Sequence, residues 1–224
     1  MRLAADDGAE LRFDTPVAGW DAGDGGVRVT LADGEAVEAD RLALCAGAWF
    51  ARLAPDLGLP LRVERNVQFW FAPRDRAAVA PDVLPVYGLE RDGARMLYGF
   101  PDLGEGVKAG IHGSGVYADP DALDRTVTAA ECERMRGRLA DFIPAAAGTF
   151  VRAAVCMYTL TPDEHFVIGP HPRAPRVIVA GGFSGHGFKF APAVGEVVSA
   201  LLAGVDPGFD LTLFAPDRFA RAAS

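Results

Sequence analysis

Hydrophobic residues along the chain follow three patterns, and each pattern predicts a different element. Alternation of apolar and polar residues, as in Val27-Arg-Val-Thr-Leu31, is typical of a strand with one buried face. Continuous apolar runs at 41–46 and 176–180 are typical of strands buried on both faces. Apolar residues at helical spacing predict two longer helices, over 121–140 and 191–202.

Short strand-like segments bounded by turn residues account for most of the remaining chain. Near the N-terminus they predict a small antiparallel meander, with strands at 10–13, 17–20, 27–31 and 36–38. Further along they predict a second group of strands, at 61–71, 83–87, 96–100 and 107–112. A short helix is expected at 48–53, and a loosely docked tail at 209–224.

The order of these elements predicts a mixed fold of the α/β type with α+β character. We expect the second group of strands and the helix 121–140 to form an antiparallel-sheet domain over 61–145. We expect it to separate the first group of strands from the block with the glycine-rich loop.

The stretch 152–191 carries most of the candidate chemistry. Cys156 and Tyr158 lie along a predicted strand, and the loop 181–187 is rich in glycine. Because glycine has no Cβ, the backbone N–H groups of such a loop can close on an anionic or flat ligand. The helix predicted at 191–202 follows the loop, and a helix N-terminus favours negative charge. The pattern therefore predicts a ligand site at this loop.

Charge and cysteine content exclude several classes of function. The 224-residue chain has 22 Lys and Arg against 30 Asp and Glu, a net charge of −8, without a basic cluster. We therefore expect no nucleic acid and no anionic membrane as partner. No apolar stretch approaches the ~20 residues of a membrane span, and the acidic start does not resemble a signal peptide. Three widely spaced cysteines favour a reducing compartment, so we predict a cytoplasmic protein.

Two other kinds of site fit the sequence poorly. Cys156, His165, His171 and His186 lack metal-ligand spacing, so we predict no metal site. The segment around Ser184 resembles the nucleophile elbow of serine hydrolases, but His186 stands where that elbow requires its last glycine.

A cationic and aromatic pocket is the better candidate. Cys156 has polar and charged neighbours in sequence, which favours thiolate chemistry over a core position. Lys108 lies in an otherwise apolar strand and Lys189 lies between two phenylalanines. Each lysine alone is equally consistent with a surface residue. Together with Tyr158 and His112, they predict a pocket for a carboxylate or a reduced oxygen species.

A long motif resembles a known family. The motif runs from Cys156-Met-Tyr-Thr-Leu-Thr-Pro-Asp-Glu-His-Phe-Val-Ile168 to Gly182-Phe-Ser-Gly-His-Gly-Phe-Lys-Phe190. It resembles the monomeric sarcosine oxidase and N-methyltryptophan oxidase family, flavin enzymes that oxidise secondary amino acids. Tyr98-Gly-Phe-Pro101 and Val107-Lys-Ala-Gly-Ile-His112 resemble the substrate-side strands of that family, and Ala46-Gly-Ala-Trp49 resembles a strand end near its FAD. The resemblance covers nearly the whole chain.

The resemblance implies a role for each of these residues. Cys156 matches the cysteine that carries FAD covalently, through the 8α-methyl carbon of the flavin. The loop against the flavin matches Gly185, His186, Gly187 and Lys189, with Lys189 also facing the substrate carboxylate. Tyr158 and His112 match residues beside the substrate, and Tyr98 matches a tyrosine over the ring. Lys108 matches the lysine that assists reaction with O2, and Ala46 with Gly47 matches backbone near the FAD.

The resemblance also implies an activity and a domain plan. The expected reaction is FAD-dependent oxidation of the C–N bond of a small secondary (N-methyl) amino acid by O2, giving an imine and hydrogen peroxide. The segments 1–60 and 146–224 would form part of a two-layer FAD-binding domain, and 61–145 would form the substrate-binding sheet domain. A fixed cation such as Lys108 suits this chemistry, because it stabilises the superoxide formed when O2 takes the first electron.

One part of the family pattern has no counterpart here. The family begins with a G-x-G-x-x-G turn that holds the FAD pyrophosphate, and this turn does not occur in the sequence. The arginines near the family's N-terminus have no match either. We therefore expect a C-terminal portion of such an enzyme, with an N-terminal FAD-binding segment as a missing partner and with exposed apolar edges. Two alternatives stay open: a flavin-free remnant that binds a small carboxylate or a partner chain, and a dehydrogenase that uses another electron acceptor.

Overall fold

The chain forms two compact units, each built from separate stretches of sequence. The computed structural model describes residues 1–91 and 93–221. The first unit consists of Met1–Leu59, Phe166–Gly181 and the chain from Phe190 onward. The second unit consists of Pro60–His165 and Gly182–Lys189.

The first unit contains two small sheets. An antiparallel meander is formed by β1 (Val17–Gly23), β2 (Gly26–Leu31) and β3 (Ala36–Ala39), with Trp20 opposite Val29 and Val29 opposite Val37. The other sheet has the order β10-β11-β4, from β10 (Val167–His171), β11 (Ala174–Gly181) and β4 (Leu42–Leu44). In this sheet β11 pairs antiparallel with β10 and parallel with β4, so both kinds of pairing occur in the first unit.

Helices complete the first unit. They are α1 (Arg2–Asp6), α2 (Phe50–Leu53), α4 (Ala191–Ala203) and α5 (Arg218–Arg221). Phe50 is fully buried beneath Gly181, where an added Cβ would lie 2.6 Å from its ring, so this strand end requires glycine. The tail contacts this unit through Phe214, whose ring stacks on Phe166 at 5.7 Å between centroids. Residues 222–224 of the predicted tail lie outside the described residues.

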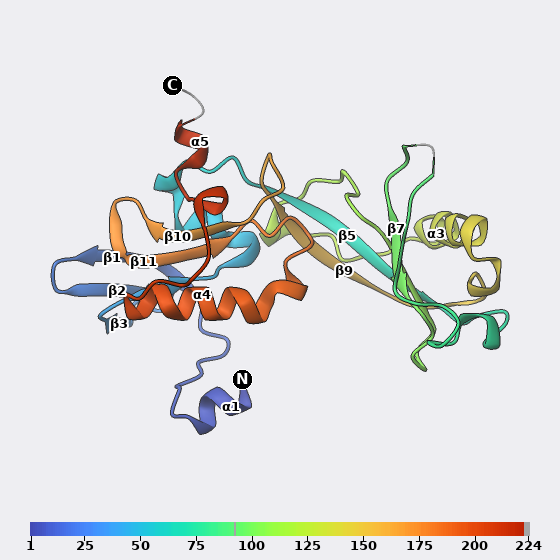
Figure 1. Cartoon of the computed structure of the whole chain (residues 1–224), viewed down its shortest axis with the longest axis horizontal. Helices are drawn as coiled ribbons and strands as arrows, with labels where there is room; N and C mark the ends of the chain where they lie inside the picture. The colour runs from blue at the N-terminus through green and yellow to red at the C-terminus, as the bar shows by residue number, and fades with distance from the viewer. Residues whose placement is uncertain (92, 222–224) are drawn as a thin grey trace. The chain divides into compact units, whose positions relative to one another are not determined.

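The second unit is a five-stranded antiparallel sheet with one helix against it (Figure 1). The strand order is β6-β7-β8-β5-β9, with bounds β5 (Arg62–Phe71), β6 (Tyr87–Leu89), β7 (Leu97–Phe100), β8 (Val107–Ile111) and β9 (Phe150–Leu160). The two long strands, β5 and β9, pair from Arg62 opposite Leu160 to Phe71 opposite Phe150 and run side by side in Figure 1. The helix is α3 (Ala129–Phe142).

The sheet of the second unit has an apolar face and a polar face. Successive side chains of a strand point to opposite faces. Phe69 and Phe71 of β5, with Leu97, Val107 and Ala109, form the buried core together with Cys132, Met135 and Leu139 of α3. The alternate positions of the same strands therefore lie on the other face, which is called the polar face below.

Single-turn 3-10 helices link these elements, at Gly47–Trp49, Pro55–Leu57, Ala77–Val79, Pro120–Ala122, Pro144–Ala146, Phe188–Phe190 and Thr212–Phe214. Among the described residues, none of the helices is long and apolar enough to cross a bilayer.

The mixed α/β fold with antiparallel sheets is confirmed, and three element predictions need correction. No strand forms at 10–13, where Arg12 is instead paired with Glu10 and Glu35 at 2.7 Å. The strand expected at 83–87 begins only at Tyr87. The helix expected from 121 begins at Ala129, because Thr128 caps it by accepting from the backbone N–H of Glu131.

The boundary between the units also differs from the predicted one. The predicted boundaries put 146–165 and 182–189 in the same domain as 1–60, whereas the structure places them in the second unit. The reason is the pairing of β9 with β5, which continues along the whole length of β5. Strand pairing between distant segments is not visible in a local pattern. That the first unit binds FAD and the second binds substrate stays a prediction.

Candidate functional site

Residues from three strands meet on the polar face of the second unit. In the strand register, Cys156 lies opposite Asn66 and Tyr158 lies opposite Glu64, while Lys108 lies opposite Trp70. Tyr98 lies opposite Gly110, next to the same strands. The alternation that buries Phe69 and Phe71 therefore puts Lys108, Cys156, Tyr158 and Tyr98 together on the opposite surface.

Two tyrosines and a histidine are in direct contact there. The hydroxyl of Tyr158 donates to that of Tyr98 at 3.4 Å, and the ring of Tyr158 lies 5.6 Å from that of His112, centroid to centroid. Burial raises the pKa of both tyrosines above its usual value, and for Tyr158 the hydrogen bond to Tyr98 raises it further. Both are therefore neutral phenols near neutral pH, and they act as hydrogen-bond partners and not as charges.

Lys108 is a cation between aromatic rings. Its Nζ lies 5.1 Å from the ring centroid of Phe100 and 5.3 Å from that of Trp70, distances at which a cation is attracted to a ring face. The guanidinium carbon of Arg152 lies 3.6 Å from the Trp70 centroid. Burial lowers the pKa of Lys108 and the charge of Arg152 lowers it further, while ionisation of Cys156 opposes the shift. Lys108 and Cys156 are thus close enough to interact electrostatically.

Gly185 lies against this group of side chains. Its φ is +79°, and an added Cβ would lie 2.6 Å from Cζ of Tyr158 and closer still to two other ring atoms. Glycine is thus required both by the backbone conformation and by the contact. The backbone N–H of Ser184 donates to the carbonyl of Thr159 at 2.9 Å, which ties the loop to the end of β9.

Residues 182–187 of the glycine loop are all in the second unit. Nε2 of His186 is 2.9 Å from the carbonyl oxygen of Glu164. Gly187 packs on Phe183, where an added Cβ would lie 2.6 Å from the Phe183 Cβ. Lys189 is exposed, in the 3-10 helix that ends the loop. Ala46 and Gly47 follow β4 and lie in the first unit. The other predicted site residues lie in the second unit.

Two buried polar residues on the polar face were missed by the sequence reasoning. Glu64 is 2% exposed, and its carboxylate accepts from the backbone N–H groups of Ser114 at 2.7 Å and Gly115 at 2.9 Å. Asn66 is fully buried and donates to the carbonyl of Ile111 at 2.9 Å, while its Oδ1 has no hydrogen-bond partner among the described residues. Both residues hold the chain on either side of His112.

A period-two pattern would have identified them. Glu64, Asn66 and Gln68 are polar residues at every second position of one predicted strand, while the alternate positions hold the apolar Val63, Val67 and Phe69, with Arg65 as the exception. Such alternation predicts that the polar members share a face. Because the neighbouring residues of β9 include Cys156 and Tyr158, this face is the one with the candidate site.

Among the described residues, no group of three His, Cys, Asp or Glu side chains is placed to hold a metal ion, and the absence of a metal site stays a prediction. Cys45, Cys132 and Cys156 are all free thiols, and Cys156 is half-buried. A thiol that is partly accessible and within electrostatic reach of a lysine is suited to covalent chemistry.

Comparison with known proteins places the chain in a family. The family model described as "DAO: FAD dependent oxidoreductase" matches residues 1–201. The chain is 42% identical to a monomeric sarcosine oxidase of Streptomyces avermitilis over 99% of this chain and 59% of the relative. It is 31% identical to an N-methyl-L-tryptophan oxidase of Salmonella heidelberg, over 99% of this chain and 59% of that protein.

Solved structures show the same fold. An L-proline dehydrogenase from P. horikoshii superposes with a TM-score of 0.80 at 24% identity, over 98% of this chain and 57% of that chain. A glycine oxidase from Geobacillus kaustophilus superposes with a TM-score of 0.75 at 24% identity, over 96% of this chain and 55% of that chain. The chain thus spans less than two thirds of the length of these relatives. It belongs to the family of FAD-dependent oxidoreductases, as the resemblance of its motifs to the sarcosine and N-methyltryptophan oxidases implies.

Proposed function

We propose that the protein oxidises the C–N bond of a small secondary amino acid with FAD and O2. The substrate loses two electrons and two protons to become an imine, and O2 takes them up as hydrogen peroxide. The observation that carries the proposal is the polar face of the second unit, where a free thiol, a lysine and two neutral tyrosines lie together. The chain spans 59% of the length of the Streptomyces avermitilis relative. The activity of this chain without a further segment is therefore a proposal as well.

The residues of the polar face fit a flavin. FAD, when bound, supplies the acceptor for a hydride equivalent and the reaction with O2. The half-buried thiol of Cys156 would carry the covalent bond to the cofactor. Gly185 lets the loop backbone come within contact of Tyr158, a close approach that a side chain would prevent. The unpartnered Oδ1 of Asn66, opposite Cys156 in the register, is a buried acceptor that a bound group can satisfy.

The charged and polar residues of the face suit the two reactants. Lys108 is held between two rings and partly desolvated, so its charge acts strongly on a reduced oxygen species beside it. Tyr158 and Tyr98 orient a substrate by hydrogen bonds, because both remain protonated near neutral pH. His112 and Lys189 would pair with the substrate carboxylate. Glu64 fixes the loop after His112, and so positions that histidine.

These residue roles lead us to propose a different function for each unit. We propose that the second unit holds substrate and the covalent attachment point, and that the first unit, with Ala46 and Gly47 after β4, contributes to FAD binding. A further segment with a dinucleotide-binding turn would complete the FAD site. The free cysteines favour a reducing compartment such as the cytoplasm.

Covalent attachment of flavin is tested by whether flavin absorption stays with the protein after it is unfolded. The purified chain is incubated with FAD, denatured in acid and separated from free flavin, and its absorption spectrum is recorded. We expect flavin absorption to stay with the protein and to be lost in Cys156→Ala. Cys45→Ala, which removes a free thiol of the first unit, is the matched control and should keep the colour. A colourless wild-type protein would remove covalent flavin from the proposal.

The flavin-free alternative gives a different result in the same preparation. A remnant that binds a small carboxylate would take up no FAD, yet would still bind acetate or pyrrole-2-carboxylate through Lys108 and Lys189. Equilibrium binding of these acids to colourless protein, weakened by Lys108→Met, would favour the remnant over the oxidase.

A further inference from the structure

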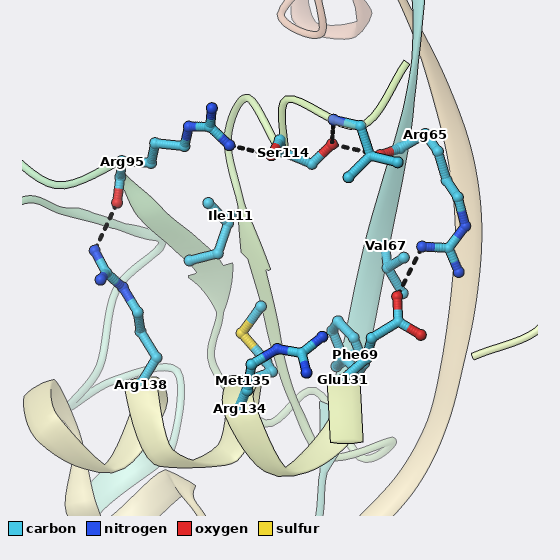
Figure 2. A pocket seen from close by; sticks show the side chains of 11 residues that line it. Arg65, Val67, Phe69, Arg95, Ile111, Ser114, Glu131, Arg134, Met135 and Arg138 are labelled. Carbon is cyan, nitrogen blue, oxygen red and sulfur yellow. Dashed lines mark hydrogen bonds and ion pairs between the residues drawn. The ribbon is translucent and has the colours of Figure 1, made fainter. Parts of the chain in front are cut away.

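A pocket lies on the face of the same sheet opposite to the polar face. It is lined by residues of β5, β8, α3 and neighbouring loops of the second unit (Figure 2), and its volume is about 270 Å³. Its apolar residues include Val67, Phe69, Ile111 and Met135. Val67 and Phe69 alternate along β5 with Asn66 and Gln68 of the polar face, so this pocket is separate from the candidate oxidase site.

The pocket is strongly cationic. Four arginines line it, Arg65, Arg95, Arg134 and Arg138, against one carboxylate, that of Glu131. The lining thus has an excess of three positive charges in a chain whose net charge is −8. A concentration of like charge around a concave site lowers the energy of an anion there and disfavours a cation.

Three of the four arginines are held in place by hydrogen bonds to backbone carbonyls. Arg65 donates to the carbonyls of Asp124 at 2.8 Å and Thr126 at 2.6 Å and pairs with Glu131 at 2.8 Å. Arg138 donates to the carbonyl of Arg95 at 2.8 Å, and Arg95 in turn donates to the carbonyl of Ser114 (Figure 2). A charge fixed by backbone carbonyls does not need to be ordered when a ligand binds.

Donor capacity is left over in the lining. The Nε of Arg138 is buried and has no hydrogen-bond partner among the described residues. The guanidinium of Arg134 is drawn among the lining side chains without an interaction to any of them (Figure 2). A buried donor without a partner costs free energy that an incoming acceptor would recover.

We propose that this pocket binds a small organic anion, a carboxylate attached to an apolar body. The carboxylate is recognised by the Arg134 and Arg138 guanidiniums, which offer paired donors to two oxygens. The apolar body packs on Phe69, Ile111 and Met135. Pockets for drug-sized ligands occupy about 300–1,000 Å³, so a volume of about 270 Å³ fits a ligand of one ring or a short branched chain. This inference does not depend on the proposed oxidase activity.

The test compares three probes that separate charge from apolar contact. Cyclohexanecarboxylate has both features, cyclohexylmethanol has the body without the charge, and acetate has the charge without the body. Each is titrated into the full chain with ¹³C-labelled methionine methyl groups. We expect cyclohexanecarboxylate to shift the Met135 signal saturably and to leave that of the exposed Met1 unchanged. The other two should bind at least about tenfold more weakly, a difference of 1.4 kcal/mol.

Matched arginine variants on α3 locate the anion. Arg134→Gln removes one positive charge from the pocket lining. Because this side chain is exposed, the variant should fold, and its affinity for cyclohexanecarboxylate should be about tenfold lower. Arg136→Gln makes the same change on the same helix, where Arg136 pairs with Glu133 outside the pocket lining, and should leave the affinity unchanged. Lys189→Gln, a change in the glycine loop, should also leave it unchanged.

Several results would overturn the proposal. Equal binding of cyclohexylmethanol and the acid would show that the arginines do not recognise the charge. If inorganic phosphate bound with the same affinity as cyclohexanecarboxylate, the pocket would be a general anion site without selectivity for a carboxylate on an apolar body. Loss of binding in Lys189→Gln but not in Arg134→Gln would assign the acid to the polar face.

Discussion

Replacing Gly185 by alanine tests how closely the glycine loop packs on the candidate site. The new Cβ would lie 2.6 Å from Cζ of Tyr158, well inside van der Waals contact. The Tyr158 ring has little room to retreat, because its hydroxyl is 3.4 Å from that of Tyr98 and its ring packs on His112. The backbone at Gly185 also has a φ of +79°, which disfavours any side chain.

The two effects have separate magnitudes. The left-handed conformation costs a non-glycine residue roughly 1–2 kcal/mol. Forcing an extra methyl group into a packed site costs roughly 1–3 kcal/mol. We therefore expect Gly185→Ala to lower the free energy of unfolding of the second unit by about 2–5 kcal/mol, a large share of the roughly 5–15 kcal/mol of a typical domain.

Two further glycines of the second unit separate these effects. Gly104 has a φ of +103° and no atom within 4 Å of an added Cβ, so Gly104→Ala should cost only the conformational part. Gly137 lies inside α3 with open space around an added Cβ, so Gly137→Ala should stabilise by about 0.5–1 kcal/mol. The expected order of stability is Gly137→Ala, wild type, Gly104→Ala, Gly185→Ala.

The assay is urea unfolding followed by tryptophan fluorescence. Trp70 is the tryptophan of the second unit, so the series is made in a background with Trp20→Phe and Trp49→Phe. With a slope of about 2 kcal/mol per molar urea, Gly185→Ala should lower the midpoint by about 1–2.5 M. Equal midpoints for Gly185→Ala and Gly104→Ala would refute the contact with Tyr158.

Three further predictions concern single side chains of the second unit. In the flavin-loaded protein, Lys108→Met should slow reoxidation by O2 about 100-fold or more, because it removes a desolvated charge; stopped-flow absorption should show little change in reduction by substrate, and equal slowing of both steps would contradict the role. Glu64→Gln should destabilise the second unit by about 1–3 kcal/mol, because a buried carboxylate that accepts two backbone N–H groups becomes an amide with one acceptor; an unchanged urea midpoint would contradict this. The backbone N–H groups of Gly106 and Gly104 hold the pKa of Asp102 below its usual value. Its carboxylate therefore stabilises the fold above the unfolded-state pKa, and this contribution is lost as the pH falls through the folded-state pKa. Melting temperatures of wild type and Asp102→Asn should differ at neutral pH and converge once the pH falls below the folded-state pKa of Asp102, and a constant difference would contradict the linkage.

Local patterns in the sequence determined the elements whose causes are local. The strand predicted at 107–112 is β8 (Val107–Ile111), and the helix predicted at 191–202 is α4 (Ala191–Ala203). The motifs around Cys156 and Gly185 also led to the family that the comparisons confirm. The start of α3 was equally local, since Thr128 and Glu131 form a capping box, but hydrophobic spacing alone extended the predicted helix too far toward 121.

The tertiary structure decided which of these elements meet. Alternation along β5 shows that Glu64 and Asn66 share a face, but only pairing with β9 places Tyr158 and Cys156 opposite them. The same pairing moves β9 into the second unit, against the predicted boundary. The arginine pocket had no sequence signal, because Arg65 and Arg138 come from a strand and a helix that are distant along the chain. A period of two or of 3.6 residues reveals which side of an element is buried, whereas the partner that buries it is chosen by contacts between segments far apart in sequence.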